Sequence, residues 1–387
     1  MVDAAKTPDD EVVARARALA RAQLAPMAAR LDEEHRFPVE SFAALAAQGL
    51  LGVTVPKRFG GLGAGPEALA RALTEIARTC ASTAVGASVT NMVAETLYRF
   101  GSEALAARFV PLLTSGAAVT GSFCLSEPAA GSDAAALRAT ARRDGEHWVL
   151  DGTKMWITSG AHSGVFVVMA RTAPLAAGHR GISAFVVTPD APGFHVGRAE
   201  HKMGLLGSNT VPIVLDGCRV PAEQLLGAEG IGFRVAMTAL DGGRITIGAM
   251  ANGIARAALD AVRAGLTDLS VEPLRAARAA TLAELEARTR AAELLVARAA
   301  HLKAAALAGK GPARFTREAA MAKLFATENA KAVTVAAVDL LGAAGVERAA
   351  VVERLARDAR VTTIFEGTSE IQRLVIGREV LAAVAGG

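Results

Sequence analysis

The order of residue patterns along the chain is the feature that most limits its fold. In residues 7–116, apolar residues recur at helical spacing, and Thr7-Pro8-Asp9-Asp10 supplies a cap, a proline and acids for the start of the first helix. In residues 119–226, short apolar runs such as VFVVMA and ISAFVV alternate with turn residues, a pattern typical of strands. From residue 231 onward the sequence is rich in Ala and Leu, which are strong helix formers. The pattern therefore predicts helices, then a β domain, then helices again.

We accordingly predict an α+β multidomain fold with three parts. These are an α-helical domain over residues 1–118, a central antiparallel β-barrel or sandwich domain over residues 119–227, and a four-helix-bundle-like domain over residues 228–387. WVLDGTKMWIT is interpreted as two strands around an Asp151–Gly152 hairpin turn. The glycines of PKRFGGLGAG, residues 56–65, follow no clear strand, which favours a connector over a phosphate-binding loop.

Composition excludes several classes of protein. Hydrophobic residues make up 52% of the chain and charged residues 21%, which is enough apolar material for a folded core. The net charge of +4 comes from scattered Arg and Lys without interleaved aromatics, so it argues against nucleic acid and still favours a phosphate-bearing ligand. The cysteines, Cys80, Cys124 and Cys218, are widely spaced and form no CxxC, so we expect reduced thiols and no metal site.

No stretch has the pattern of a targeting or membrane segment. The first thirteen residues include early acids and no apolar run of a secretory signal. The longest charge-free run, residues 109–126, is interrupted by proline, glycine and hydroxyl residues, so it does not predict a membrane span. We therefore expect a cytoplasmic protein.

The stretch IFEGTSEIQR, residues 364–373, places one carboxylate, Glu366, directly after two bulky apolar residues. Ser369 and Gln372 have the spacing of a capping box, so a helix is predicted to begin just after this acid. A structural interpretation is an acid near the positive end of the helix dipole. A chemical interpretation is a base whose pKa is raised by burial. Residue types alone favour the structural interpretation.

The same stretch resembles the carboxyl-terminal signature of the acyl-CoA dehydrogenase family, in which Glu-Gly-Thr is followed by Ile-Gln-Arg. Four more motifs occur in the family's order: CLSEPAAGSD at 124–133, KMWIT at 154–158, KMGLLGSNT with CRVPAEQLLG between 202 and 227, and LDGGR at 240–244. The resemblance covers nearly the whole chain and includes the three-part architecture.

The resemblance implies a reaction. Members of the family oxidise an acyl thioester, carried by CoA or by a carrier protein, to its 2,3-enoyl form, and FAD accepts the hydride from Cβ at N5. Glu366 matches the base that removes the Cα proton. Isovaleryl-type relatives instead carry the base just before the Arg of the LDGGR-like motif, where this chain has Gly243. Flavin monooxygenases of the superfamily usually lack the base, so Glu366 argues against that activity.

The resemblance also implies the binding residues. Leu125 and Ser126 are expected at the pyrimidine edge of the flavin, Trp156 beside the ring and the Thr158 hydroxyl facing it. Asp241 and Arg244 match positions near the thioester, although an i,i+3 ion pair on a helix explains them equally well. The complete set of cofactor-binding residues is Phe123, Leu125, Ser126, Ser132, Trp156, Ile157, Thr158, Thr368 and Glu370. The substrate-binding set is Ser132, Asp241, Arg244 and Gly367.

Two family motifs are altered, and both normally face the ADP half of the flavin in a neighbouring subunit. Residues 263–275, RAGLTDLSVEPLR, lack the Arg/Phe pair, and Asp339 stands where relatives have an amide that can donate to phosphate. The alteration predicts weak FAD binding. The chain then forms either a homo-oligomer (a dimer of dimers) or a heterotetramer with a related chain, whereas a non-catalytic role is disfavoured by Glu366, Trp156 and Thr158. Leu206 is a further departure, since many relatives have Arg there.

Some properties stay open at this level. An electron-transfer flavoprotein or a similar acceptor is the expected redox partner. Residues 79–97 are expected to shape the acyl pocket, but their small side chains do not predict the length or branching of the acyl chain.

Overall fold

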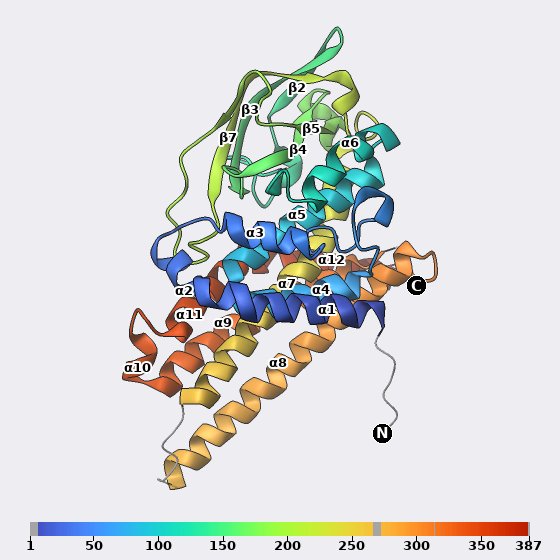
Figure 1. Cartoon of the computed structure of the whole chain (residues 1–387). Helices are drawn as coiled ribbons and strands as arrows, with labels where there is room; N and C mark the ends of the chain where they lie inside the picture. The colour runs from blue at the N-terminus through green and yellow to red at the C-terminus, as the bar shows by residue number, and fades with distance from the viewer. Residues whose placement is uncertain (1–6, 266–271, 313, 386–387) are drawn as a thin grey trace.

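A seven-stranded sheet lies at one end of the molecule and most of the helices pack together at the other, in a computed structural model that describes residues 7–265, 272–312 and 314–385 (Figure 1). One helix, Glu103–Thr114, lies beside the sheet. The first helix begins where the sequence predicts, because the Thr7 side chain and Asp10 form a reciprocal capping box. The N-terminal group consists of α1 (Pro8–Leu19), η1 (Ala20–Leu24), α2 (Ala25–Glu33), α3 (Val39–Ala47), η2 (Lys57–Phe59), α4 (Pro66–Ala77), α5 (Ala81–Phe100) and α6 (Glu103–Thr114).

The central sheet has the order β1-β4-β2-β3-β7-β6, and β5 also pairs with β4. Most neighbours are antiparallel, as the sequence predicts, but β4 pairs in parallel with both β1 and β2. The β2–β3 hairpin lies between β1 and β4 in the chain and brings β4 back in the direction of β1, so the sheet is mixed. The strands are β1 (Thr120–Cys124), β2 (Thr140–Asp144), β3 (His147–Thr158), β4 (Ser163–Arg171), β5 (Ile182–Val187), β6 (Phe194–Val196) and β7 (Thr210–Pro221).

The predicted hairpin turn at Asp151–Gly152 is wrong. These residues lie inside the continuous strand β3, and the turn falls earlier, where Asp144 pairs with His147. Gly152 has a φ of 139°, the register shifts beside it, and a Cβ there would lie 2.7 Å from the Ala139 Cβ. The Asp-Gly pair thus marks a β-bulge with a close chain crossing, which requires glycine for the same backbone reason as a turn.

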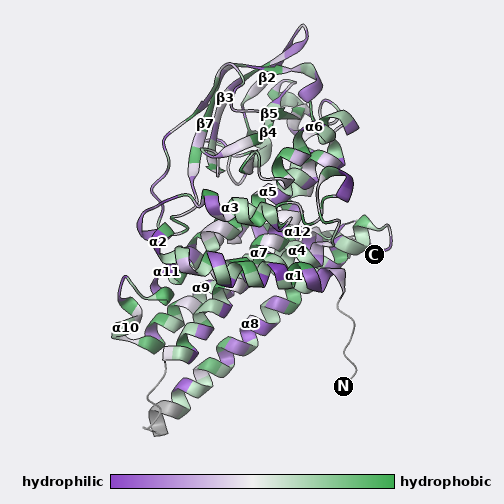
Figure 2. Ribbon diagram, in the orientation of Figure 1, coloured by the Kyte–Doolittle hydropathy of each residue, from purple (hydrophilic) through white to green (hydrophobic). Residues whose placement is uncertain are grey.

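The C-terminal group is built around α7 (Gly232–Gly265), whose side chains are buried along most of its length. It packs against α4 and α5 of the first group and against α9, so the two helical groups share one hydrophobic core. Along α8 (Glu272–Leu307), hydrophilic and hydrophobic bands alternate (Figure 2). The remaining helices are α9 (Thr316–Leu341), α10 (Ala343–Val346), α11 (Val351–Thr362) and α12 (Ser369–Ala385).

Within the described ranges, no helix is long and apolar enough to cross a membrane. The same residues contain no group of three or more His, Cys, Asp or Glu side chains placed to hold a metal ion. Cys80, Cys124 and Cys218 are free thiols and are buried. Burial raises the pKa of the Cys124 thiol to about 12, so this cysteine is a core residue rather than a nucleophile.

Candidate active site

A cleft of ≈ 1780 Å³ separates the edge of the sheet from the C-terminal helices. One wall comes from the β domain and the other from α7 and the segment that leads into α12. Eleven of the residues predicted from the sequence line this cleft together. They are Phe123, Leu125, Ser126, Ser132, Trp156, Thr158, Asp241, Arg244, Glu366, Gly367 and Thr368.

Trp156 forms an exposed aromatic shelf on the sheet side of the cleft. Its side chain is 59% exposed, and its backbone is left-handed, with a φ of 62°. The pairing of β3 with β7 shifts register between Lys154 and Ile157, so a bulge interrupts the strand's alternation at this residue. Bulges next to functional sites re-aim side chains, and a left-handed non-glycine residue is a strained one. The strained backbone at Trp156 thus lowers the stability of the fold, and it presents an indole face to the cleft.

A buried ion pair supports the shelf from behind. Lys154 is fully buried, and its Nζ donates to Glu127 Oε1 at 2.7 Å and to the Leu125 carbonyl at 3.3 Å. Glu127 also accepts from the backbone N–H groups of Arg138 and Ala139, at 2.6 and 3.0 Å. Lys154 therefore ties the KMWIT and CLSEP segments together, although its side chain does not reach the cleft. Neither Lys154 nor Glu127 is among the site residues predicted from the sequence.

Glu366 faces the cleft from the helical side. The backbone of Glu366 is left-handed, with a φ of 53°, and that of Gly367 has a φ of 92°. Both carboxylate oxygens are buried and accept no hydrogen bond. Burial raises the pKa of Glu366 to about 7, with Lys323 and Arg244 opposing the rise. The chemical interpretation of this acid, a base with a raised pKa, is the one that its surroundings match.

The helix after this loop starts as predicted, but its cap is different. The Thr368 hydroxyl accepts from the N–H of Ile371 at 3.3 Å, so Thr368 occupies the capping position. Ser369 instead donates to Glu328 at 2.6 Å. The Gln372 side chain turns back and donates to the Gly367 carbonyl at 3.0 Å. The predicted Ser369–Gln372 capping box is therefore wrong, because both side chains are engaged in holding the loop.

Lys323 of α9 holds the loop that carries Glu366, and it is not among the residues predicted from the sequence. It is fully buried, and its Nζ donates to the Gly367 carbonyl at 2.7 Å. Burial lowers the pKa of Lys323 to about 8, while the nearby Glu366 carboxylate raises it. A signal was present, because this lysine lies on the same helical stripe as the buried residues Ala319, Ala320 and Ala326. A cation on an apolar stripe indicates an internal partner.

The LDGGR segment lies on α7 directly beside Glu366. A Cβ added to Gly243 would lie 2.0 Å from Glu366 Oε2, so the two alternative base positions of the family converge on one point in this chain. Arg244 Nη1 pairs with Asp241 Oδ1 at 2.6 Å, and Thr316 donates to Asp241 Oδ2 at 2.6 Å. The i,i+3 ion pair is thus formed, and both of its members also line the cleft.

Two predicted cofactor residues lie elsewhere. The Ile157 side chain is buried in the core of the β domain, and Glu370 is exposed on the first turn of α12 near Arg373. Leu206 is buried, and Asp339 is exposed near the end of α9. Residues 263–275, which carry the first altered family motif, fall partly outside the described residues.

The charges of the cleft match an anionic ligand. Seven cationic side chains outnumber four acids, and such an excess attracts phosphate-bearing molecules. The cations are Arg99, Lys202, Arg234, Arg244, Arg314, Arg360 and Arg378, and the acids are Asp133, Asp241, Glu366 and Glu379.

Three models of one protein family match successive parts of the chain. Family models for the acyl-CoA dehydrogenase N-terminal, middle and C-terminal domains match residues 8–117, 122–218 and 230–381. The mitochondrial short-chain specific acyl-CoA dehydrogenase of Homo sapiens is 43% identical over 376 residues, which is 94% of this chain and 88% of the relative. The chain belongs to the acyl-CoA dehydrogenase family. The acryloyl-CoA reductase (NADH) of Anaerotignum propionicum is 40% identical over 98% of this chain and 96% of its own length.

The solved structures give the same result. Butyryl-CoA dehydrogenase from Megasphaera elsdenii superposes with a TM-score of 0.92 at 33% identity and covers 98% of this chain and 100% of its own. As a member of the acyl-CoA dehydrogenase family, this chain is a flavin-dependent oxidoreductase whose cofactor is FAD. The cleft fits that group, since it offers an exposed indole, hydroxyl groups, an excess of cations and an unpartnered buried carboxylate in one space.

Proposed function

We propose that this acyl-CoA dehydrogenase oxidises a short acyl thioester to its trans-2-enoyl form, with Glu366 as the catalytic base. The observation that carries the proposal is the buried, unpartnered carboxylate of Glu366 in the same cleft as the Trp156 shelf. An unsatisfied buried carboxylate is costly, so its persistence favours a chemical role over a structural one.

The chain's own residues supply the proton chemistry. An ordinary glutamate has a pKa of about 4.3 and is a weak base, whereas a buried one holds a proton more tightly. The pKa of Glu366 is raised to about 7. At neutral pH it is both partly ionised and basic enough to take a Cα proton. Bound FAD supplies the acceptor for the two electrons and the hydrogen of Cβ. On this proposal Trp156, Thr158, Ser126 and Leu125 hold the isoalloxazine ring.

The short acyl chain is proposed from the relatives. The human relative is named as short-chain specific, and the structural neighbour as a butyryl-CoA dehydrogenase. CoA is the proposed carrier, and the cationic side chains of the cleft support a ligand that carries phosphates. An acyl carrier protein is the alternative carrier of the thioester. The name of the Anaerotignum relative also raises the reverse direction, reduction of an enoyl thioester.

The test is turnover by the purified flavoprotein with an artificial electron acceptor. Butyryl-CoA and the butyryl thioester of an acyl carrier protein are compared at matched concentrations. The expected result is dye reduction with butyryl-CoA, and loss of at least about 10³-fold in kcat for Glu366→Gln, since the step loses its base. Reduction with the carrier-protein thioester alone would select the alternative carrier. Turnover of Glu366→Gln near the wild-type rate would remove Glu366 from its proposed role.

The proposal extends to partners. Exposed apolar side chains on α8, α9 and α12 support an oligomer, either of this chain or with a related chain; they are Leu294, Met321, Phe325, Val335, Leu374 and Leu381. An electron-transfer flavoprotein is the proposed acceptor, and the cytoplasmic location stays a prediction. Light scattering and FAD content of the chain purified alone test the assembly. A tetramer with full FAD occupancy would argue against the heteromeric alternative.

A further inference from the structure

A small cavity lies behind the reacting end of the cleft. It has a volume of ≈ 20 Å³ and shares Met92, Arg99 and Thr238 with the large cleft. Gly243, whose Cα approaches the Glu366 carboxylate, forms part of its wall. The cavity therefore begins beside the base, where the acyl chain beyond the reacting carbons would run. Its volume suits a water molecule rather than several methylene groups.

A buried ion pair lines this cavity. Lys303 Nζ of α8 donates to Glu95 Oε2 of α5 at 2.8 Å, and the two residues are 5% and 7% exposed. Arg99 Nη1 donates to Glu95 Oε1 at 3.1 Å. A Cβ on Gly242 would lie 2.7 Å from Lys303 Nζ, so the absence of a side chain at Gly242 leaves room for the ammonium group. The two charges are thus fixed in place by three helices.

The other polar groups of the cavity are already paired among themselves. Ser88 donates to Thr246 at 2.7 Å, and Thr246 donates to the Gly243 carbonyl at 2.9 Å. Thr96 donates to the Met92 carbonyl at 2.7 Å. Both cations near Glu95 are engaged by its carboxylate. The described lining of the cavity therefore offers no free cation to an acyl chain that ends in an acid. An acyl chain with an apolar end would meet the ion pair and remove its remaining solvation.

We propose that the Glu95–Lys303 ion pair is the specificity-determining floor of the acyl pocket and restricts the enzyme to acyl chains about the size of butyryl. The inference rests on the proposed function and names the residues that select its substrate. A methylene group that meets an apolar wall adds affinity, whereas one pushed against a buried ion pair does not. The charge of the ion pair, as well as the volume of the pocket, then limits the length of the acyl chain.

The test is the double variant Glu95→Leu with Lys303→Met, in the FAD-loaded enzyme. Replacement of a buried ion pair by apolar residues of similar size is often neutral for stability, whereas loss of one partner is not. The variant also removes the partner of Arg99, but that side chain is 29% exposed and keeps its hydration. The kcat/KM for hexanoyl-CoA, relative to that for butyryl-CoA, should rise about tenfold, which corresponds to about 1.4 kcal/mol. The matched control is Arg256→Met with Glu293→Leu, an ion pair between α7 and α8 that lies outside the cavity lining. The control should leave this ratio unchanged.

The outcomes separate the two proposals. A wild-type enzyme that oxidises no thioester overturns both the proposed function and this inference. Equal kcat/KM for butyryl-CoA and octanoyl-CoA in the wild type, or an unchanged ratio in a double variant that still oxidises butyryl-CoA, overturns the inference alone. If the double variant does not fold, the wild-type series from butyryl-CoA to octanoyl-CoA still decides, because a floor of this kind requires a steep fall in kcat/KM with chain length.

Discussion

Gly243 packs so closely against the Glu366 carboxylate that no larger residue fits at position 243. A Cβ there would lie 2.0 Å from the Glu366 Oε2 atom. This helix position and the loop that carries the acid therefore constrain each other. The space that accommodates the carboxylate is the space left by the missing side chain.

Gly243→Ala should therefore displace the Glu366 carboxylate from its position. A misplacement of about 1 Å costs on the order of 10²-fold in rate, so kcat should fall by about that factor while the protein stays yellow with FAD. The control is Gly377→Ala on α12, where an added Cβ meets nothing within 4 Å. This change should leave kcat unaltered. Wild-type kcat in Gly243→Ala would show that the carboxylate has room to move without loss.

Activity should rise with pH through about 7, where Glu366 ionises. The base acts in its ionised form, so the pH profile of kcat/KM should show an acid limb near that value. An acid limb at about 4.3, the ordinary pKa of a glutamate, would show that burial does not control this group.

Glu366→Gln should stabilise the protein at alkaline pH. Because the folded-state pKa of Glu366 is raised to about 7, its contribution to stability is fully present below the unfolded pKa and is lost as pH rises through 7. The neutral amide lacks the ionised group, so unfolding at pH 8 should require about 1–3 kcal/mol more than in the wild type. At pH 4.5 the two proteins should unfold at similar denaturant concentrations. Equal stability at both pH values would contradict the raised pKa.

Lys323→Met should move the acid limb of the pH profile to higher pH. Lys323 holds the Gly367 carbonyl and places a positive charge near Glu366, which lowers the pKa of that carboxyl. Its removal should raise the apparent pKa by about one unit, at about 1.4 kcal/mol per unit. Lys310→Met, which changes an exposed lysine between α8 and α9, is the control. A fall in kcat at every pH without a shift would indicate that Lys323 only positions the loop.

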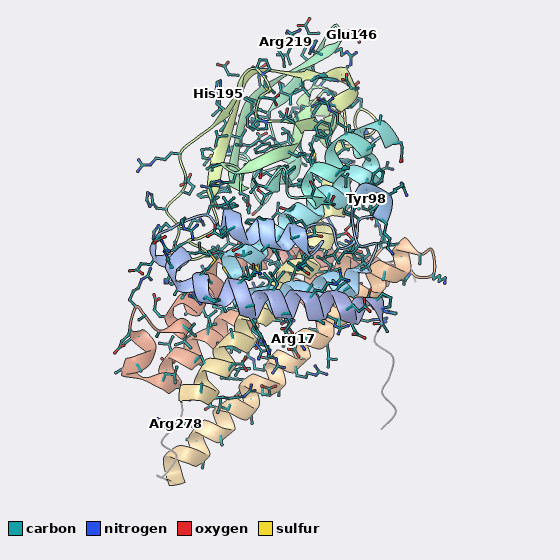
Figure 3. All side chains as sticks on the ribbon, viewed as in Figure 1. Arg17, Tyr98, Glu146, His195, Arg219 and Arg278 are labelled. Atoms are coloured by element: carbon teal, nitrogen blue, oxygen red, sulfur yellow. The ribbon has the colours of Figure 1, made fainter. Side chains whose placement is uncertain are left out.

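Lys154→Met should destabilise the β domain. Loss of one partner leaves Glu127 buried without its counter-charge, which typically costs about 3–5 kcal/mol in chemical denaturation. The control is Arg219→Met, which removes an exposed pair with Asp144 at the far tip of the sheet (Figure 3). That change should have no measurable effect. Similar losses in both variants would show that the pair at Lys154 is not special.

Much of the architecture could be predicted from the sequence because periodicity and capping are local signals. The start of α1 at its Thr7 cap and the strand runs of β4 and β5 are examples. The bulge at Gly152 was misread as a turn, because a left-handed glycine serves both purposes and only the partner strand distinguishes them.

The candidate site was predicted from motifs and could not have been predicted from local pattern alone. Trp156 and Glu366 became a pair only through the resemblance, since the contacts between their elements depend on tertiary packing. Lys323 and the Glu95–Lys303 ion pair were missed because no motif marks them. Their partners lie in distant helices, so even the position of Lys323 on an apolar stripe indicates burial without identifying the group that it contacts.

The two walls of the cleft have a consequence for how the enzyme is made on the ribosome. The shelf at Trp156 belongs to the sheet, whereas the acid at residue 366 enters with the segment before α12. Domains fold as they emerge, amino-terminal parts first. A nascent chain therefore completes its cofactor shelf long before it acquires its base. A message truncated before that segment would encode the Trp156 shelf without the Glu366 base.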